Sequence, residues 1–277
     1  NASEVGIANI LSHYSLFIGT MIVGYVLTEI DLGLFSAAHR VVVLPWAYVI
    51  VSFQRVLLPT LARWYVGSRT QFENFVEKFF RFTVIGSFGI GLAGTFFGPT
   101  LMSLLYPSAY AGATEVFVVL LWALAFAGMR FIFEIALVAS DNQRQYLKGM
   151  VLLAALYTIA TPLLSSKYGI VGAAWAGVAA EFGYFLYLAI TFPHMQVATL
   201  VRQIWRPVIA CLLAAVTGAS FGSVPFAVQG ITSLCVFLGF LVFSKALSSE
   251  DAQTLLQLAG ARQAINRGGS NDSRSGE

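Results

Sequence analysis

The sequence predicts an all-α integral membrane protein with about eight transmembrane helices. Of its 277 residues, 58% are hydrophobic and only 10% are charged, whereas a soluble globular domain carries about a quarter charged residues. The apolar residues gather in runs of roughly 20, the length that a helix needs to cross a hydrocarbon core of about 30 Å. The basic residues fall mainly in alternate connecting segments, which is typical of a multi-pass membrane protein.

Eight hydrophobic runs cover most of the chain. They lie near residues 8–28, 33–58, 82–105, 113–138, 147–165, 170–192, 205–221 and 225–244. If the first run starts in the cytoplasm, only Lys167 falls on the outer side, and cytoplasmic loops carry the excess of basic residues. The cytoplasmic side then receives Arg63, Arg69, Lys78, Arg81, Arg144, Lys148, Arg202, Arg206, Lys245, Arg262, Arg267 and Arg274. We therefore expect both ends of this segment to be cytoplasmic.

Two connecting segments have an apolar stripe opposite charged residues. Residues 70–82 place Phe72, Phe75, Val76 and Phe79 on one helical face, and residues 194–206 repeat the pattern with Val197, Leu200, Val201 and Ile204. Such amphipathic segments predict interfacial helices on the inner leaflet. In the tail, Ser248 followed by Asp251 is a helix start signal. The residues from Arg267 onward are polar and rich in Gly and Ser, which predicts disorder.

Several hydrophobic runs contain small residues and prolines at positions that affect helix packing. Gly169, Ala173 and Gly177 are spaced by four on one face of the sixth run, where small side chains permit close approach of helices in lipid. Pro45 and Pro162 lie inside other runs and can kink them. These features fit either tight static packing or bends that allow helices to rock during alternating access.

The second run carries cations where lipid would be expected. His39 and Arg40 lie about two turns inside it, and Arg55 follows before it ends. Arg40 and Arg55 differ by roughly 60° around the helix and are about 22 Å apart along it, with Tyr48 and Ser52 on similar bearings. Because Arg offers a fixed planar set of donors, such a stripe suits a ligand that carries phosphate. The alternative is that both arginines snorkel to the interfaces.

Three further ionisable residues lie inside runs, and such residues are functional hypotheses by default. Arg130 and Glu134 are four positions apart on the fourth run and can pair within one helix. Glu181 has no cation near it in sequence, so it needs a partner on another helix, a proton or water. It is either a proton site in a transport cycle or a structural hydrogen-bonding group. His13, beside Ser12 and Ser15, makes the first run locally polar.

The motifs that signal other classes of protein are absent from the sequence. It contains no Walker-type phosphate loop and no Cys/His cluster with metal-binding spacing. No Ser/His/Asp grouping or large outer loop indicates a membrane enzyme, and no Arg-rich aromatic strip indicates nucleic-acid binding. We therefore expect no enzyme activity, no catalytic residues, no cofactor, no metal and no nucleic-acid partner.

Four blocks in order carry a resemblance to a known family. They are LGLFSAAHRV (32–41), RVLLPTLAR (55–63), LYPSAYAGA (105–113) and KYGIVGAAWAGVAAEF (167–182). Together they resemble the polysaccharide flippases of the multidrug/oligosaccharidyl-lipid/polysaccharide exporter superfamily. That resemblance implies two lobes of about six helices around a central cationic cavity. Residues 1–193 would form the C-terminal lobe, residues 194–244 an interfacial helix with two additional transmembrane helices, and residues 245–277 a partly disordered cytoplasmic tail.

The resemblance also implies a substrate and a set of partners. The substrate would be an undecaprenyl-pyrophosphate-linked oligosaccharide, flipped across the bacterial cytoplasmic (inner) membrane for O-antigen, capsule or exopolysaccharide assembly. The expected partners are membrane lipids, a missing N-terminal lobe of the same protein, and glycan polymerase or assembly proteins. The alternatives are a lipid II flippase or a cation-coupled multidrug exporter of the same superfamily. Since drug exporters favour acidic cavities for cationic substrates, the three arginines inside runs disfavour the exporter.

The candidate site residues follow from the residues and the resemblance together. Arg40 is the best match for a pyrophosphate-binding arginine of the family, followed by Arg130 and Arg55. The predicted substrate-lining residues are Arg40, His39, Tyr48, Ser52, Arg55 and Arg130, and the predicted proton- or ion-coupling residues are Glu181 and Glu134.

Overall fold

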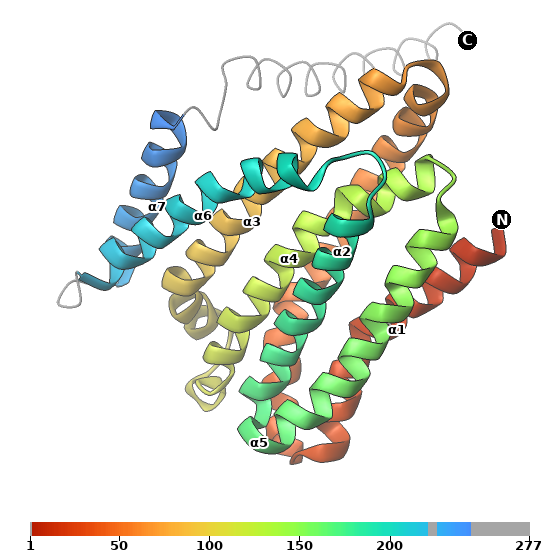
Figure 1. The fold of residues 1–277 in the computed structure, drawn as a ribbon. Helices are drawn as coiled ribbons and strands as arrows, with labels where there is room; N and C mark the ends of the chain where they lie inside the picture. The colour runs from red at the N-terminus through yellow and green to blue at the C-terminus, as the bar shows by residue number, and fades with distance from the viewer. Residues whose placement is uncertain (1, 221–225, 245–277) are drawn as a thin grey trace, which may run out of the picture.

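The structure, a computed structural model, describes residues 2–220 and 226–244, and every long element within them is an α-helix (Figure 1). The helices are α1 (Ala2–Val26), α2 (Glu29–Gly67), α3 (Arg69–Leu105), α4 (Ala113–Ala139), α5 (Gln143–Thr191), α6 (Val197–Ser220) and α7 (Phe226–Phe243), with a 3-10 turn, η1 (Ser108–Tyr110), before α4. The predicted tail, including its helix signal at Ser248 and its disorder beyond Arg267, lies outside the described residues.

Helix α5 is two membrane spans joined at a glycine. Gly169 has φ 62° and ψ −146°, a conformation open essentially to glycine alone. The chain reverses there, so the two halves of α5 form a helical hairpin (Figure 1). Six described helices are long and apolar enough to cross a membrane, and α7 is shorter. With α5 counted as two spans, the helices match the eight predicted runs, and the all-α membrane fold is confirmed.

The segment 70–82 is not the separate interfacial helix that its pattern suggests. It forms the first turns of α3, which continues for 37 residues, or about 55 Å. Phe72 and Val76 are fully buried in the main core, and Phe75 and Phe79 pack against that core. No proline lies between Arg69 and Pro99 to interrupt the helix. The apolar stripe therefore faces protein, because α2 folds back onto it.

The segment 194–206 likewise belongs mostly to a longer helix. After a short linker, α6 runs without interruption from Val197 to Ser220. Leu200 is buried and Ile204 packs against the core, whereas Val197 and Val201 are exposed. Only part of the predicted apolar face therefore remains available to lipid.

Three buried clusters hold the helices together. The largest cluster contains residues of α2, α3, α4 and α5 and lies at the end of the bundle that carries most of the basic residues. Its members include Leu61, Phe80 and Phe133. The second lies toward the opposite end and includes Phe35, Phe117 and Ala174. In the third, α6 and α7 pack on α3 as a flanking hairpin (Figure 1). The candidate site lies in a cavity between the first two clusters.

His194, in the linker between α5 and α6, packs against the turn that connects α2 to α3. Its side chain is 2% exposed and contacts the rings of Tyr65, Phe72 and Phe192. Arg69 Nη2 donates to His194 Nδ1 at 2.9 Å. Because guanidinium nitrogens only donate, the ring must be neutral and protonated on Nε2. Burial, followed by the nearby Arg69 charge, lowers the pKa of His194 below 6.5, although Glu73 partly opposes that shift.

Acidification is expected to loosen this contact. A histidine whose pKa is lowered by folding stabilises the native state above the unfolded pKa of 6.5 and loses that contribution as the pH falls below it. We expect the melting temperature to decrease between about pH 7.5 and about pH 5.5. The decrease should be smaller in His194→Asn, whose amide oxygen can accept from Arg69 without titrating. Equal pH dependence in the two proteins, measured by thermal unfolding in detergent, would contradict this assignment.

Candidate functional site

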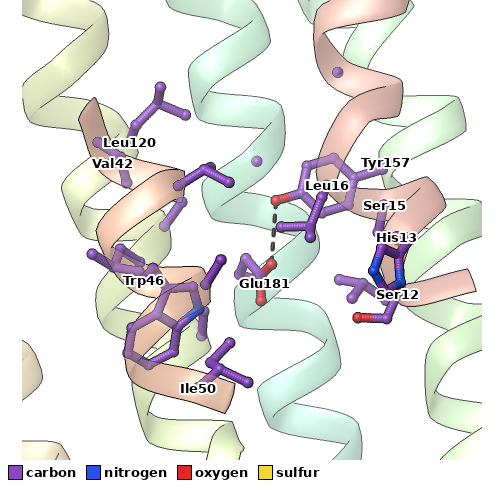
Figure 2. A pocket seen from close by; sticks show the side chains of 18 of the residues that line it. Ser12, His13, Ser15, Leu16, Val42, Trp46, Ile50, Leu120, Tyr157 and Glu181 are labelled. Carbon is purple, nitrogen blue, oxygen red and sulfur yellow. Dashed lines mark hydrogen bonds between the residues drawn. The ribbon is translucent and has the colours of Figure 1, made fainter. Parts of the chain in front are cut away.

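A groove with mainly apolar walls and a small number of polar and charged side chains lies between α1 and α2, with α4 and α5 as its floor. Its cavity volume is about 230 Å³. Ser12, His13 and Leu16 of α1 face Trp46 and Ile50 of α2 across it (Figure 2). The elements position these residues because α1 packs on α5 and α2 packs on α4, while α1 and α2 make fewer contacts with each other. The groove therefore opens between the first two helices.

The floor of the groove holds a buried ion cluster. Arg130 of α4 donates to Glu181 of α5 from Nε at 2.6 Å and from Nη2 at 3.3 Å. Its Nη1 donates to Glu134, one turn along α4. The Tyr157 hydroxyl donates to Glu181 Oε1 at 3.2 Å, as Figure 2 shows. The guanidinium also lies over the ring of Tyr184, 4.9 Å from its centroid.

This arrangement leaves Arg130 with little capacity for an external anion. All three guanidinium nitrogens donate to carboxylates of the protein. Glu134 and Glu181 are each 7% exposed, so separating either from Arg130 would leave a charge buried without compensation. The cluster contains one cation and two carboxylates, so it carries one surplus negative charge when both acids are ionised.

A second, smaller cavity adjoins the groove. Its volume is about 120 Å³, and it lies toward the end of the bundle where α1 begins, α2 and α4 end, and α5 begins. Asn9, Gln54, Glu134 and Tyr146 line both cavities. Glu134 is therefore the carboxylate of the cluster that borders the two spaces.

The structure brings four of the predicted site residues together. His39, Arg130, Glu134 and Glu181 all line the groove. The expected pairing of Arg130 with Glu134 along α4 is present, and Glu181 finds its cation on a neighbouring helix.

The other four predicted residues, Arg40, Tyr48, Ser52 and Arg55, are exposed and do not line the groove. Their places on α2 differ. At 100° per residue, Arg40 lies within roughly 20° of Ala47 and Val51, which do line the groove. Arg40 is therefore at the rim of the groove, whereas Tyr48, Ser52 and Arg55 lie farther round the exposed side of the helix.

Sequence reasoning missed several lining residues. Asn9 and Gln54 line both cavities, Tyr157 binds Glu181, and Tyr146 borders Glu134. Asn9 lies four residues before His13, and the carbonyl of Asn9 contacts His13 Nδ1 at 2.9 Å. The stretch from Asn9 to Ser15 thus contains several polar residues in a largely apolar helix. This pattern is visible in the sequence and could have identified Asn9. The tyrosines gave no comparable signal, because tyrosine is common in membrane helices.

No metal site accompanies the cluster. Within the described ranges, no three or more His, Cys, Asp or Glu side chains converge in a way that could hold a metal ion. The guanidinium already lies against both carboxylates, so it would repel a second cation at the same place.

Comparisons with known proteins agree with these features. Residues 3–115 match a family model described as polysaccharide biosynthesis protein. The fold is similar to that of a solved structure titled "Lipid II flippase MurJ, inward closed conformation", with a TM-score of 0.64 and 17% sequence identity. That match covers 88% of this chain and 52% of the other, so this chain spans about half the length of that flippase. No curated protein sequence matches.

The family model over residues 3–115 agrees with the resemblance to polysaccharide flippases, and the solved structure confirms the all-α fold. The solved structure and the long apolar helices together support a multi-pass membrane protein.

Proposed function

We propose that this chain, which has the fold of a lipid II flippase and a match to polysaccharide biosynthesis proteins, flips undecaprenyl-pyrophosphate-linked oligosaccharide for surface glycan assembly. The movement would be alternating access, with no covalent chemistry. The observation that carries the proposal is a groove within membrane-spanning helices whose floor holds the charged side chains of Arg130, Glu134 and Glu181. Ionisable residues at that depth are costly and typically line a substrate or ion pathway.

The small volume of the groove indicates that this chain forms only part of the substrate cavity. Ligand pockets for drug-sized molecules occupy about 300–1,000 Å³, and this groove holds only about 230 Å³. An oligosaccharide head group therefore needs more space than the groove encloses. On either side of it, Ile10, Met21 and Tyr48 are 67–77% exposed. We infer that a second lobe of the full-length protein faces α1 and α2 and completes the cavity.

Two groups of charged residues have separate roles in this proposal. Arg40, exposed at the rim, is available to bind the pyrophosphate, and Arg55 offers a further cation nearer the basic end of α2. Arg130 is held by Glu134 and Glu181, so it acts with them in coupling the cycle and not in binding phosphate. Membrane orientation follows the basic residues, with the start of α1 and the ends of α2 and α4 at the cytoplasmic face of a bacterial inner membrane.

Removal of the Arg40 guanidinium is expected to abolish or strongly reduce flipping. Hydrogen bonds from arginine to phosphate are charge-assisted and frequently bidentate, so each contributes more than a hydrogen bond between neutral groups. In a host deleted for the full-length gene, lipid-linked oligosaccharide should accumulate in the inner leaflet. Wild type should restore export, and a normally expressed Arg40→Ala variant should not. Lys167→Ala, which removes a cation near the Gly169 turn, is the matched control and should restore export.

Two results would overturn the proposal. Normal surface glycan after deletion, in a host without a second flippase, would exclude an essential role in glycan export. Accumulation of lipid II and not of glycan precursor would favour the alternative that the structural neighbour suggests, a lipid II flippase. A drug exporter would show neither accumulation and would change drug susceptibility.

A further inference from the structure

Glu134 and Glu181 contact the same guanidinium but have different surroundings. Both oxygens of Glu181 accept from Arg130, and one also accepts from Tyr157. Glu134 receives a single donor nitrogen of Arg130. Glu181 is therefore well stabilised as an anion, because hydrogen bonds to the charged form favour that form. The surplus negative charge of the cluster is more readily neutralised at Glu134.

A buried hydroxyl next to the cluster is further evidence that Glu134 is the carboxylate that takes up the proton. Tyr184 is fully buried, and its hydroxyl lies beside Glu134 without a hydrogen bond of normal geometry to it or to another described residue. Glu134 is the carboxylate within reach of that hydroxyl. An unpartnered buried hydroxyl is costly and calls for an explanation. A carboxyl group that gains and loses a proton would provide it, since the hydroxyl can accept from the acid and donate to the anion.

We propose that Glu134 is the proton-exchanging group of this cluster and that its proton reaches the basic end of the bundle through the second cavity, past Asn9, Gln54 and Tyr146. In this step the O–H bond of the Glu134 carboxylic acid breaks, and the proton passes to a water molecule in that cavity. The carboxylate that remains stays paired with Arg130. Glu181 is the fixed counter-ion of Arg130 and does not exchange.

The cavities indicate the direction of access. Both border Glu134, and the smaller one extends from it toward Val5, Leu58 and Val138 at the basic end. The larger one extends the other way, to Phe35 and Leu120, which belong to the second buried cluster. A buried water molecule requires about 10–15 Å³ and two to four polar partners. Both cavities exceed that volume, and the smaller one offers the polar side chains of Asn9, Gln54, Glu134 and Tyr146. Water therefore has room beside Glu134 on the basic side.

A proton fits this site better than a metal cation. It neutralises the surplus charge without placing a second cation beside the guanidinium. The other titratable or charged groups that line the groove or contact the cluster are His13 of α1, His39 of α2, Arg130 of α4, and Tyr146, Tyr157, Glu181 and Tyr184 of α5. None of the tyrosines ionises near neutral pH in its ordinary range.

The test uses infrared spectroscopy of the full-length protein in detergent near neutral pH. Wild type should show the absorption band of a protonated buried carboxylic acid. Glu134→Gln should lose it. Glu134→Asp should retain a shifted band, which guards against loss by misfolding, and Glu181→Asp, which keeps the number of charges in the cluster, should leave the band where it is in wild type. Absence of the band in wild type, or a band that shifts in Glu181→Asp and not in Glu134→Asp, would overturn the assignment.

The route is tested by the rate of hydrogen–deuterium exchange of that band. Asn9→Leu, which fills the junction of the two cavities, should slow exchange several-fold. The matched control is Gly19→Leu, which fills the opposite part of the groove, where an added side chain meets open space, and it should leave the rate unchanged. The reverse result would overturn the route. Replacing sodium by choline in the buffer should not change the band. If the band is present in choline and lost in sodium, a monovalent cation and not a proton occupies the site.

The role of this proton in driving transport rests on the proposed function, but the spectroscopic result does not. If Glu134 exchanges a proton and deletion leaves surface glycan unchanged, the proposed function fails and the proton site stands. If export depends on the protein and the band is absent, the proton site fails and the flippase proposal stands.

Discussion

Replacing Arg130 by methionine is expected to produce the largest loss of stability in this protein. The change leaves Glu134 and Glu181, each 7% exposed, without their shared cation. Removing one partner of a buried ion pair costs about 3–5 kcal/mol, because the remaining charge stays buried without compensation. We expect a lower yield of folded protein and a clearly lower melting temperature for the purified full-length variant in detergent.

The control removes all three charges together. Arg130→Met combined with Glu134→Gln and Glu181→Gln leaves no net charge in the site, so stability should recover in large part. Arg130→Lys should stay destabilised, since an ammonium cannot reproduce the planar set of three nitrogens that contacts both carboxylates. A single Arg130→Met variant as stable as wild type would show that the cluster is solvated and not buried.

The second large effect is expected at the turn of α5. An added Cβ at Gly172 would meet the carbonyl oxygen and carbon of Leu164, which are backbone atoms that cannot rotate away. Gly172→Ala should therefore displace one half of the hairpin against the other, at a cost of about 1–3 kcal/mol. Gly169→Ala should cost a similar amount for a different reason, namely its φ of 62°.

Gly177→Ala is the matched control on the same helix. Its new Cβ would lie 3.5 Å from the Tyr157 hydroxyl, an ordinary contact distance, so its stability should stay close to that of wild type. Thermal unfolding of the three variants in detergent compares them directly. Equal melting temperatures for Gly172→Ala and Gly177→Ala would mean that the turn does not pack as described.

The sequence predicted the spans better than the connections. The lengths of the hydrophobic runs and the uneven distribution of basic residues between loops located all eight spans. This works because a membrane helix must form its backbone hydrogen bonds internally and be long enough to cross the bilayer. The same reasoning was wrong about residues 70–82. An amphipathic pattern says that one face is apolar, but it does not say whether lipid or protein covers that face. In the structure, Phe72 and Val76 are covered by protein.

Composition and the length of the hydrophobic runs identify this chain as an all-α membrane protein with costly charges inside its spans, because neither depends on long-range contacts. Which of those charges meet depends on how the helices pack. Arg130 and Glu181 are 51 residues apart and come together because α4 packs on the second half of α5. Arg40 and Arg55, which share a stripe in the sequence, remain on the exposed side of α2. Helical periodicity gives the bearing of a side chain on its own helix, but the neighbour that it faces depends on how the helices pack.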